Sequence, residues 1–113
     1  MREIYHIVPR PDWEQLPPGP FTAPSLRSEG FIHCAGECQV ERVANRFYGQ
    51  EKDLIVLRID ADALGDLLRD EAPSDDSFPG ETFPHVYGEI DRRAILRIEV
   101  LCRDGEGRWV FRP

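Results

Sequence analysis

Apolar residues in this chain of 113 residues are divided among short segments, which prolines and glycines separate. The two longest, LIVLRI at 54–59 and AILRIEVLC at 94–102, are rich in branched apolar side chains, as strands are. Neither approaches the run of about 18 apolar residues that a membrane span requires. We therefore expect a single domain over 1–113 with one core, and 54–59 as a central strand.

Four further segments are interpreted as strands or strand-like. EIYHIV at 3–8 and FIHC at 31–34 combine aromatic and β-branched residues, and FPHVYG at 83–88 has a similar composition. RWVFR at 108–112 follows the tight-turn sequence DGEG and is expected to return antiparallel to 94–102 as a hairpin.

Three helical segments are expected. Residues 11–16 predict a short helix, since Pro11 and Asp12 suit a first turn. SLRSE at 25–29 predicts a single turn that Ser25 caps and Gly30 ends. The longest helix is expected between Gly36 and Gly49, where apolar residues recur at steps of three and four: Val40, Val43, Ala44 and Phe47.

Two less regular segments complete the prediction. IDADALGDLL at 59–68 predicts a turn followed by a short helix or an edge piece. APSDDSFPGET at 72–82 contains two prolines, a glycine and several acids, and it has the length of a functional loop. The chain therefore belongs to the α+β class, with about six strands and two or three helices.

Charge limits the partners that this chain can have. Fourteen basic and twenty-one acidic side chains give a net charge of −7, which argues against a general DNA or RNA binder. A small anionic ligand needs only one or two local cations, and Arg10, Arg27 and Arg46 are available for that role. No Walker or G-x-G-x-x-G motif is present.

The N-terminal segment and the cysteines indicate a cytoplasmic protein with reduced thiols. Charged Arg2 and Glu3 precede a strand-like segment, not the long apolar region of a secretion signal. An odd count of three cysteines argues against a disulfide framework in such a chain. His33, Cys34 and Cys38 could offer zinc ligands, but no second paired cluster completes a closed site, so we expect no metal.

The three histidines are the main candidates for chemistry. His6 in IYHIV, His33 in GFIHC and His85 in FPHVYG each lie among bulky apolar neighbours, and each alone could be a hydrogen-bonded core residue. A small core gains little from three buried imidazoles, so we expect them to open on one shared cleft. There they could bind ribose or nucleotide groups, move a proton or hold a metal. His85 and Tyr87, two residues apart on a strand, should face this cleft together.

Six segments carry a resemblance to a known family: IYHIVPRPDW, PSLRSEGFIHCA, VANRFY, LIVLRIDADAL, FPHVYGEI and AILRIEV. In combination they resemble the family known as domain of unknown function 952, over almost the whole chain from Ile4 to about Val100. That family is grouped by fold with the ADP-ribosyltransferase superfamily, whose members bind NAD in a cleft of a split, mixed sheet. The resemblance implies an ADP-ribosyltransferase-like fold with such a sheet, and NAD or another small anionic nucleotide as ligand.

The resemblance also implies roles for particular residues. His6 is similar to the histidine that grips the ribose of NAD in one branch of the superfamily, and His33, His85 and Tyr87 resemble other residues that line the cleft. These four are the expected catalytic residues. The expected cofactor-binding residues are His6, Ser25, His33 and Tyr87.

The glutamate that closes the superfamily's site has no clear counterpart, although Glu89 lies near its expected place. The resemblance implies binding of NAD or an ADP-ribose derivative, with ADP-ribosyl transfer or NAD glycosidic cleavage as the reaction. A binding module without catalysis and a histidine-ligated metal hydrolase are the alternatives.

Overall fold

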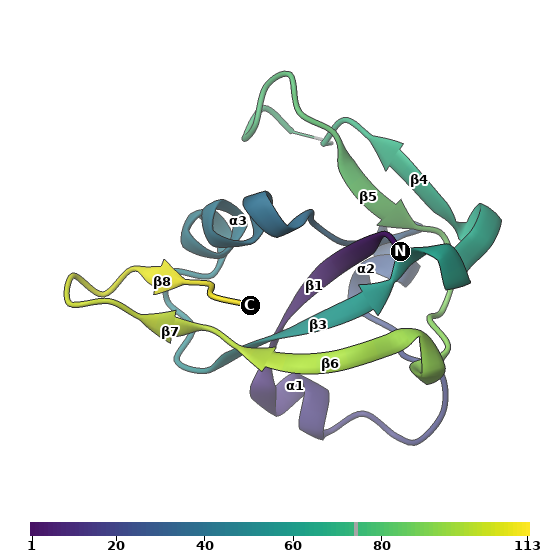
Figure 1. The fold of residues 1–113 in the computed structure, drawn as a ribbon, viewed down its shortest axis with the longest axis horizontal. Coiled ribbons are helices and arrows are strands. Elements are labelled where there is room, and N and C mark those ends of the chain that lie inside the picture. Colours follow the sequence, from purple (N-terminus) through teal and green to yellow (C-terminus); the bar gives the residue numbers. More distant parts are fainter. Residues whose placement is uncertain (74) are drawn as a thin grey trace.

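The computed structural model describes residues 1–73 and 75–113, whose longer strands form two antiparallel sheets (Figure 1). In the first sheet, β3 (Leu54–Asp60) lies between β1 (Glu3–Pro9) and β6 (Ile95–Val100). The four residues from Leu54 to Leu57 are fully buried, which suits a strand with a continuous apolar run. The predicted central position of this strand is confirmed.

The second sheet is shorter and has β5 (Phe83–Val86) at its centre, between β2 (Ile32–His33) and β4 (Leu68–Glu71). A backbone bridge joins the two sheets: the Tyr5 amide donates to the Ala35 carbonyl at 2.8 Å, and the Ala35 amide returns a bond at 2.7 Å. The six strands therefore follow one another in the order β6-β3-β1-β2-β5-β4, as a sheet split between β1 and β2.

The C-terminal hairpin is formed by β7 (Cys102–Arg103) and β8 (Trp109–Val110). Its turn closes where the Gly107 amide donates to the Asp104 carbonyl at 3.0 Å. Gly107 has a φ of +82°, a conformation that glycine adopts without steric cost. A hairpin at the predicted turn is confirmed, but among the described residues β8 pairs only with β7 and not with β6, as the expected pairing to 94–102 required.

The α+β class is confirmed, but the expected mixed sheet is wrong, because every strand pairing among the described residues is antiparallel. The chain leaves the first sheet after Asp60, the last residue of β3, and residues 61–67 do not continue in that sheet. They form a 3₁₀ helix, η2 (Ala61–Leu67), which carries the chain across to β4 in the second sheet. The expected short helix or edge piece is thus a helix followed by an edge strand.

The remaining helices are short, and the expected cap of one of them is wrong. Ala23, not Ser25, precedes the first turn of α2, because the Ser25 hydroxyl donates to the Phe31 carbonyl at 2.7 Å. No helix in the described part of the chain has the length and apolar character needed to cross a membrane. The helices are α1 (Arg10–Glu14), α2 (Pro24–Ser28), η1 (Glu37–Gln39), α3 (Val40–Phe47) and η3 (Arg92–Ala94).

Side chains of β1 and β3 alternate between two cores. Ile4 and Leu57 belong to the core that includes Ile32 and Val86 of the second sheet. The side chains that point to the other face of these two strands, including Tyr5, pack with α3 and β8. The antiparallel register of β1 and β3 therefore decides which core each side chain joins.

Helix α3 is fastened to β8 by side-chain bonds that imitate strand pairing. Asn45 accepts from the Trp109 amide at 2.8 Å and donates to the Trp109 carbonyl at 3.1 Å. The Trp109 indole in turn donates to the carbonyl of Tyr48, at the end of α3, at 2.9 Å. These bonds hold the helix against the C-terminal hairpin.

We expect Asn45→Ala to lower the free energy of unfolding by about 1–3 kcal/mol, because it leaves a partly buried amide and carbonyl without partners. Chemical denaturation would measure this change. Gln50→Ala, on the exposed turn after the same helix, is the control and should change stability by less than about 0.5 kcal/mol. Equal effects of the two substitutions would contradict the fastening role of Asn45.

Candidate functional site

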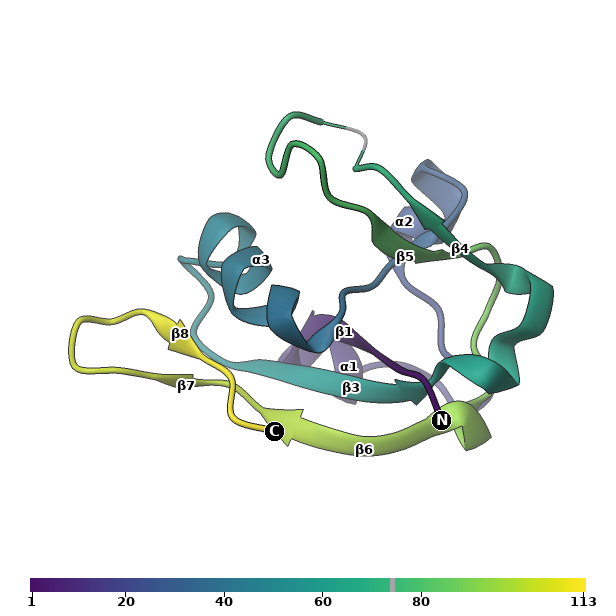
Figure 2. The same ribbon diagram turned by 45° about the horizontal axis from the view of Figure 1, so that its top comes forward.

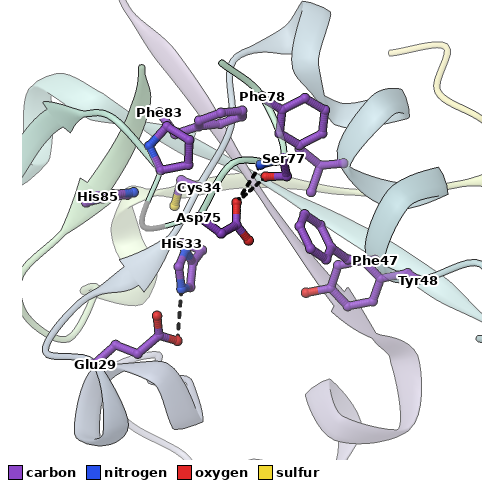
Figure 3. A pocket seen from close by; sticks show the side chains of 12 residues that line it. Glu29, His33, Cys34, Phe47, Tyr48, Asp75, Ser77, Phe78, Phe83 and His85 are labelled. Atoms are coloured by element: carbon purple, nitrogen blue, oxygen red, sulfur yellow. Dashed lines mark hydrogen bonds and ion pairs between the residues drawn. The ribbon is translucent and has the colours of Figure 1, made fainter. Parts of the chain in front are cut away.

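A pocket of about 420 Å³ lies between α3, the loop that joins β4 to β5, and the second sheet. In Figure 2 this loop reaches from the second sheet toward α3. Figure 3 shows the two imidazoles on one side of the pocket and the α3 rings on the other. We call it the aromatic pocket, after its lining rings: His33, Phe47, Tyr48, Phe78, Phe83 and His85.

His33 and His85 are brought together by strand pairing. They are directly opposite each other in the β2–β5 register, and their ring centres lie 5.7 Å apart. Phe31 stacks on His85 with ring centres 4.0 Å apart and contacts His33 edge-on at 4.7 Å. The prediction of a shared cleft is confirmed for these two histidines.

Glu71 fixes the orientation of His85. Its Oε1 lies 2.9 Å from His85 Nδ1 and accepts from the Tyr87 hydroxyl at 2.5 Å. The hydrogen bonds from Tyr87 and His85 lower the pKa of Glu71, so Glu71 is a carboxylate that accepts from Nδ1–H. The other ring nitrogen of His85, Nε2, has no hydrogen-bond partner in the described structure.

The expectation that Tyr87 faces the cleft beside His85 is wrong: Tyr87 follows the last residue of β5 and shares the Glu71 carboxylate with His85, but it does not line the pocket. Sequence reasoning missed Glu71 as a site residue. Its position depends on the pairing of β4 with β5, in which Glu71 is opposite Phe83 and diagonal to His85. Recognising 68–71 as a strand antiparallel to 83–86 would have been the signal.

The charged groups that line the pocket are acidic. Glu29 Oε2 lies 3.1 Å from His33 Nε2. Asp75 accepts from the amide of Ser77 at 2.9 Å and from its hydroxyl, and these bonds lower the pKa of the Asp75 carboxyl. No lysine or arginine is among the lining residues that the structure describes; Arg46 lies outside them, 5.3 Å from the ring centre of Phe47.

The expected place of His6 in the same cleft is wrong. His6 is only 7% exposed and does not line the pocket, since the register of β1 turns it toward the core that contains Phe21. Its Nδ1 donates to the His33 carbonyl at 2.6 Å. Burial lowers the pKa of His6 to about 4, so the ring is neutral near pH 7.

Other predicted residues also lie outside the lining of the pocket. The Ser25 hydroxyl is bonded to the backbone at Phe31, and Glu89 is an exposed residue that takes no part in the pocket. Cys34 does line it, but burial raises the pKa of its thiol to about 12, which disfavours a nucleophilic thiolate. Among the described residues, no group of three or more His, Cys, Asp or Glu side chains is placed to hold a metal ion.

Comparisons with known proteins place the chain among relatives of the same shape. A family model described as "Protein of unknown function (DUF952)" matches residues 7–98. The crystal structure of protein CC0527 from Caulobacter crescentus is 27% identical with a TM-score of 0.80, over 96% of this chain and 93% of that one. The solution structure of CC0527 is 28% identical with a TM-score of 0.75, over 96% and 91%. No curated protein matches.

We expect His6→Asn to flatten the pH dependence of stability. A histidine pKa of about 4 in the folded state, against about 6.5 when unfolded, contributes stability above pH 6.5 that is lost as the pH falls toward 4. Asparagine keeps a donor near the position of Nδ1 but does not titrate. Between about pH 7 and pH 4 the variant should lose about 3 kcal/mol less unfolding free energy than the parent.

Denaturant unfolding at several pH values measures this difference, with Gln50→Ala as a control that should follow the parent chain. If the unfolding free energy of His6→Asn falls with pH as steeply as that of the parent chain, protonation of His6 is not what destabilises the fold in acid.

Proposed function

We propose that this chain, which belongs to the DUF952 family, binds NAD or an ADP-ribose derivative in the aromatic pocket, with the fold of an ADP-ribosyltransferase-like domain. The observation that carries the proposal is the composition of the pocket. Aromatic rings form one side, and two imidazoles form the other. The Glu71 carboxylate holds the His85 ring through Nδ1, and Nε2 of that ring has no partner among the described residues.

The size of the pocket favours one nucleoside end of such a ligand. A volume of about 420 Å³ is near the lower end of the range for small-molecule sites, about 300–1,000 Å³. Phe47 of α3 is half exposed, and Phe78 packs on it with ring centres 6.3 Å apart. A flat heterocycle can stack on such rings, and its ribose would then reach His33 and His85.

The charges of the lining favour a cationic or neutral ring over a phosphate. Glu29 and Asp75 bring carboxylates to the pocket, and the described lining has no guanidinium or ammonium group. The nicotinamide ring of NAD is positively charged, so we place this end inside. The pyrophosphate would then lie toward Arg46, outside the lining.

The same groups suit cleavage of the bond between nicotinamide and ribose. As this C–N bond breaks, its electron pair leaves with the nicotinamide nitrogen and positive charge develops on the ribose. The carboxylate of Asp75 would stabilise that charge. Water then adds to the ribose carbon and gives its proton to Nε2 of His85, while Glu71 stabilises the imidazolium; the products are ADP-ribose, nicotinamide and a proton.

The fold adds support of a coarser kind. Two antiparallel sheets of three strands meet at the Tyr5–Ala35 bridge, so the sheet is split as the resemblance implies, although its described strand pairings are antiparallel and not mixed. A binding module without catalysis is the second candidate, favoured by the position of Glu89 away from the pocket. It would use the same ring stacking and ribose contacts without turnover.

Ligand binding should raise the melting temperature of the chain. At a hundredfold excess of ligand over its Kd, the fold should gain about 2.7 kcal/mol. His85→Asn keeps a donor for Glu71 but removes the ring position of Nε2, so we expect about a tenfold loss of affinity. Calorimetry with NAD, ADP-ribose and nicotinamide riboside measures both effects.

Glu89→Gln is the control, since Glu89 lies outside the pocket, and this variant should bind as the parent does. A Kd of about 1 mM corresponds to a binding free energy of about −4 kcal/mol. If none of the three ligands binds the parent chain at that concentration, the nucleotide proposal fails.

Release of nicotinamide from NAD distinguishes the enzyme hypothesis from that of a binding module without catalysis. If the chain cleaves NAD, Asp75→Asn should slow nicotinamide release by about a hundredfold, as loss of one electrostatic contact does, while NAD still binds. Chromatography of the reaction mixture measures the product, and Glu89→Gln should retain the parent rate. Binding without release in the parent chain would favour the module.

A further inference from the structure

Strand β6 is an open edge of the first sheet. It pairs with β3 on one side and has no strand partner on the other within the described part of the chain. Figure 2 shows it along the outer border of the sheet. Its apolar side chains are unusually accessible: Leu96 is 40% exposed, Ile98 47% and Val100 54%. An apolar edge with free backbone groups is a template for another strand.

The register of β6 fixes which backbone groups point outward. Glu99 is opposite Val56 and Arg97 opposite Arg58, and the Leu101 amide donates to the Leu54 carbonyl at 3.3 Å. Because bonded and non-bonded pairs alternate in an antiparallel ladder, odd-numbered residues from 97 to 101 bond to β3. Ile98 and Val100 therefore direct their amides and carbonyls to the open edge.

We propose that two copies of this chain associate by antiparallel pairing of their β6 strands about a two-fold axis at Ile98. Ile98 of one copy is then opposite Ile98 of the other, and Leu96 is opposite Val100. On the other face of the joined sheet, Arg97 of each copy is opposite Glu99 of its mate. The two sheets become one, with the same surface contributed by both copies.

The charges of Arg97 and Glu99 favour the axis at Ile98 over an axis one residue to either side. An outward-facing residue must pair with another outward-facing residue, so the axis passes through a residue, and the positions nearest the middle of the strand are Arg97, Ile98 and Glu99. An axis at Arg97 would put two arginines opposite each other, and one at Glu99 would oppose two glutamates. Only the axis at Ile98 gives two pairs of opposite charge, and cross-strand pairs of this kind stabilise a sheet.

The charged side chains of Arg97 and Glu99 support the same pairing. The Glu99 side chain is 11% exposed, and its Oε2 has no hydrogen-bond partner among the described residues. Arg97 is 68% exposed, and its closest approach to Glu99 of its own chain is 3.9 Å, too long for a hydrogen bond. In the dimer, the guanidinium of the second copy's Arg97 would add to the ion pair that Glu99 makes with Arg58, whose nitrogen and oxygen lie 3.6 Å apart.

Analytical ultracentrifugation of the full chain, from about 10 µM to about 1 mM, tests the proposal. We expect a concentration-dependent dimer, since pairing of single strands forms a small interface of the weak class. Arg97→Glu opposes two glutamates across the interface and should raise the dimer Kd by at least about tenfold. Arg27→Glu, the same charge change on exposed α2, should leave the Kd unchanged.

A second variant keeps the test independent of Arg97. Ile98→Lys places two positive charges at the axis without removing any contact of Glu99, and it should also give a monomer. Thermal unfolding confirms that each variant is folded. A parent chain that stays monomeric up to about 1 mM, or an Arg97→Glu variant that associates as the parent does, would overturn the proposal.

Discussion

The backbone bridge between Tyr5 and Ala35 is the interaction on which the rest of this structure depends. It fastens the second sheet to the edge of β1, and the His6 imidazole strengthens the junction by donating to the His33 carbonyl. Together these bonds set the angle at which the sheet carrying His33 and His85 faces α3. A buried, neutral histidine therefore has a structural role beside the pocket, and the titratable groups of the pocket come from other strands.

The pocket combines parts that are separate in the sequence. Helix α3 brings Phe47, and the bonds from Trp109, near the far end of the chain, to Asn45 and Tyr48 hold this helix in place. The second sheet brings His85 and, from its edge strand, Glu71. The chemistry of the site thus depends on two anchorings, one of the helix to the C-terminal hairpin and one of the second sheet to β1.

The aromatic pocket and strand β6 differ in the charges of their side chains. Carboxylates line the pocket without a neighbouring cation in the described lining, which matches the net charge of −7 and favours a cationic or hydroxyl-rich ligand end. At β6 the charges alternate instead, with Arg97 and Glu99 on one face of an apolar strand. The first arrangement suits recognition of a small molecule, and the second suits a copy of the same strand.

The sequence by itself determined the α+β class, the central strand 54–59, the hairpin at the C-terminus and the family, because these depend on local periodicity, turn residues and motifs. It also placed His33 and His85 in one cleft, together with His6. Only the tertiary structure decided that His6 is buried elsewhere, that Glu71 orients His85, and that the strand pairings among the described residues are antiparallel. The physical reason is that a strand's register turns each side chain to one face or the other, and register is set by partners distant in the chain.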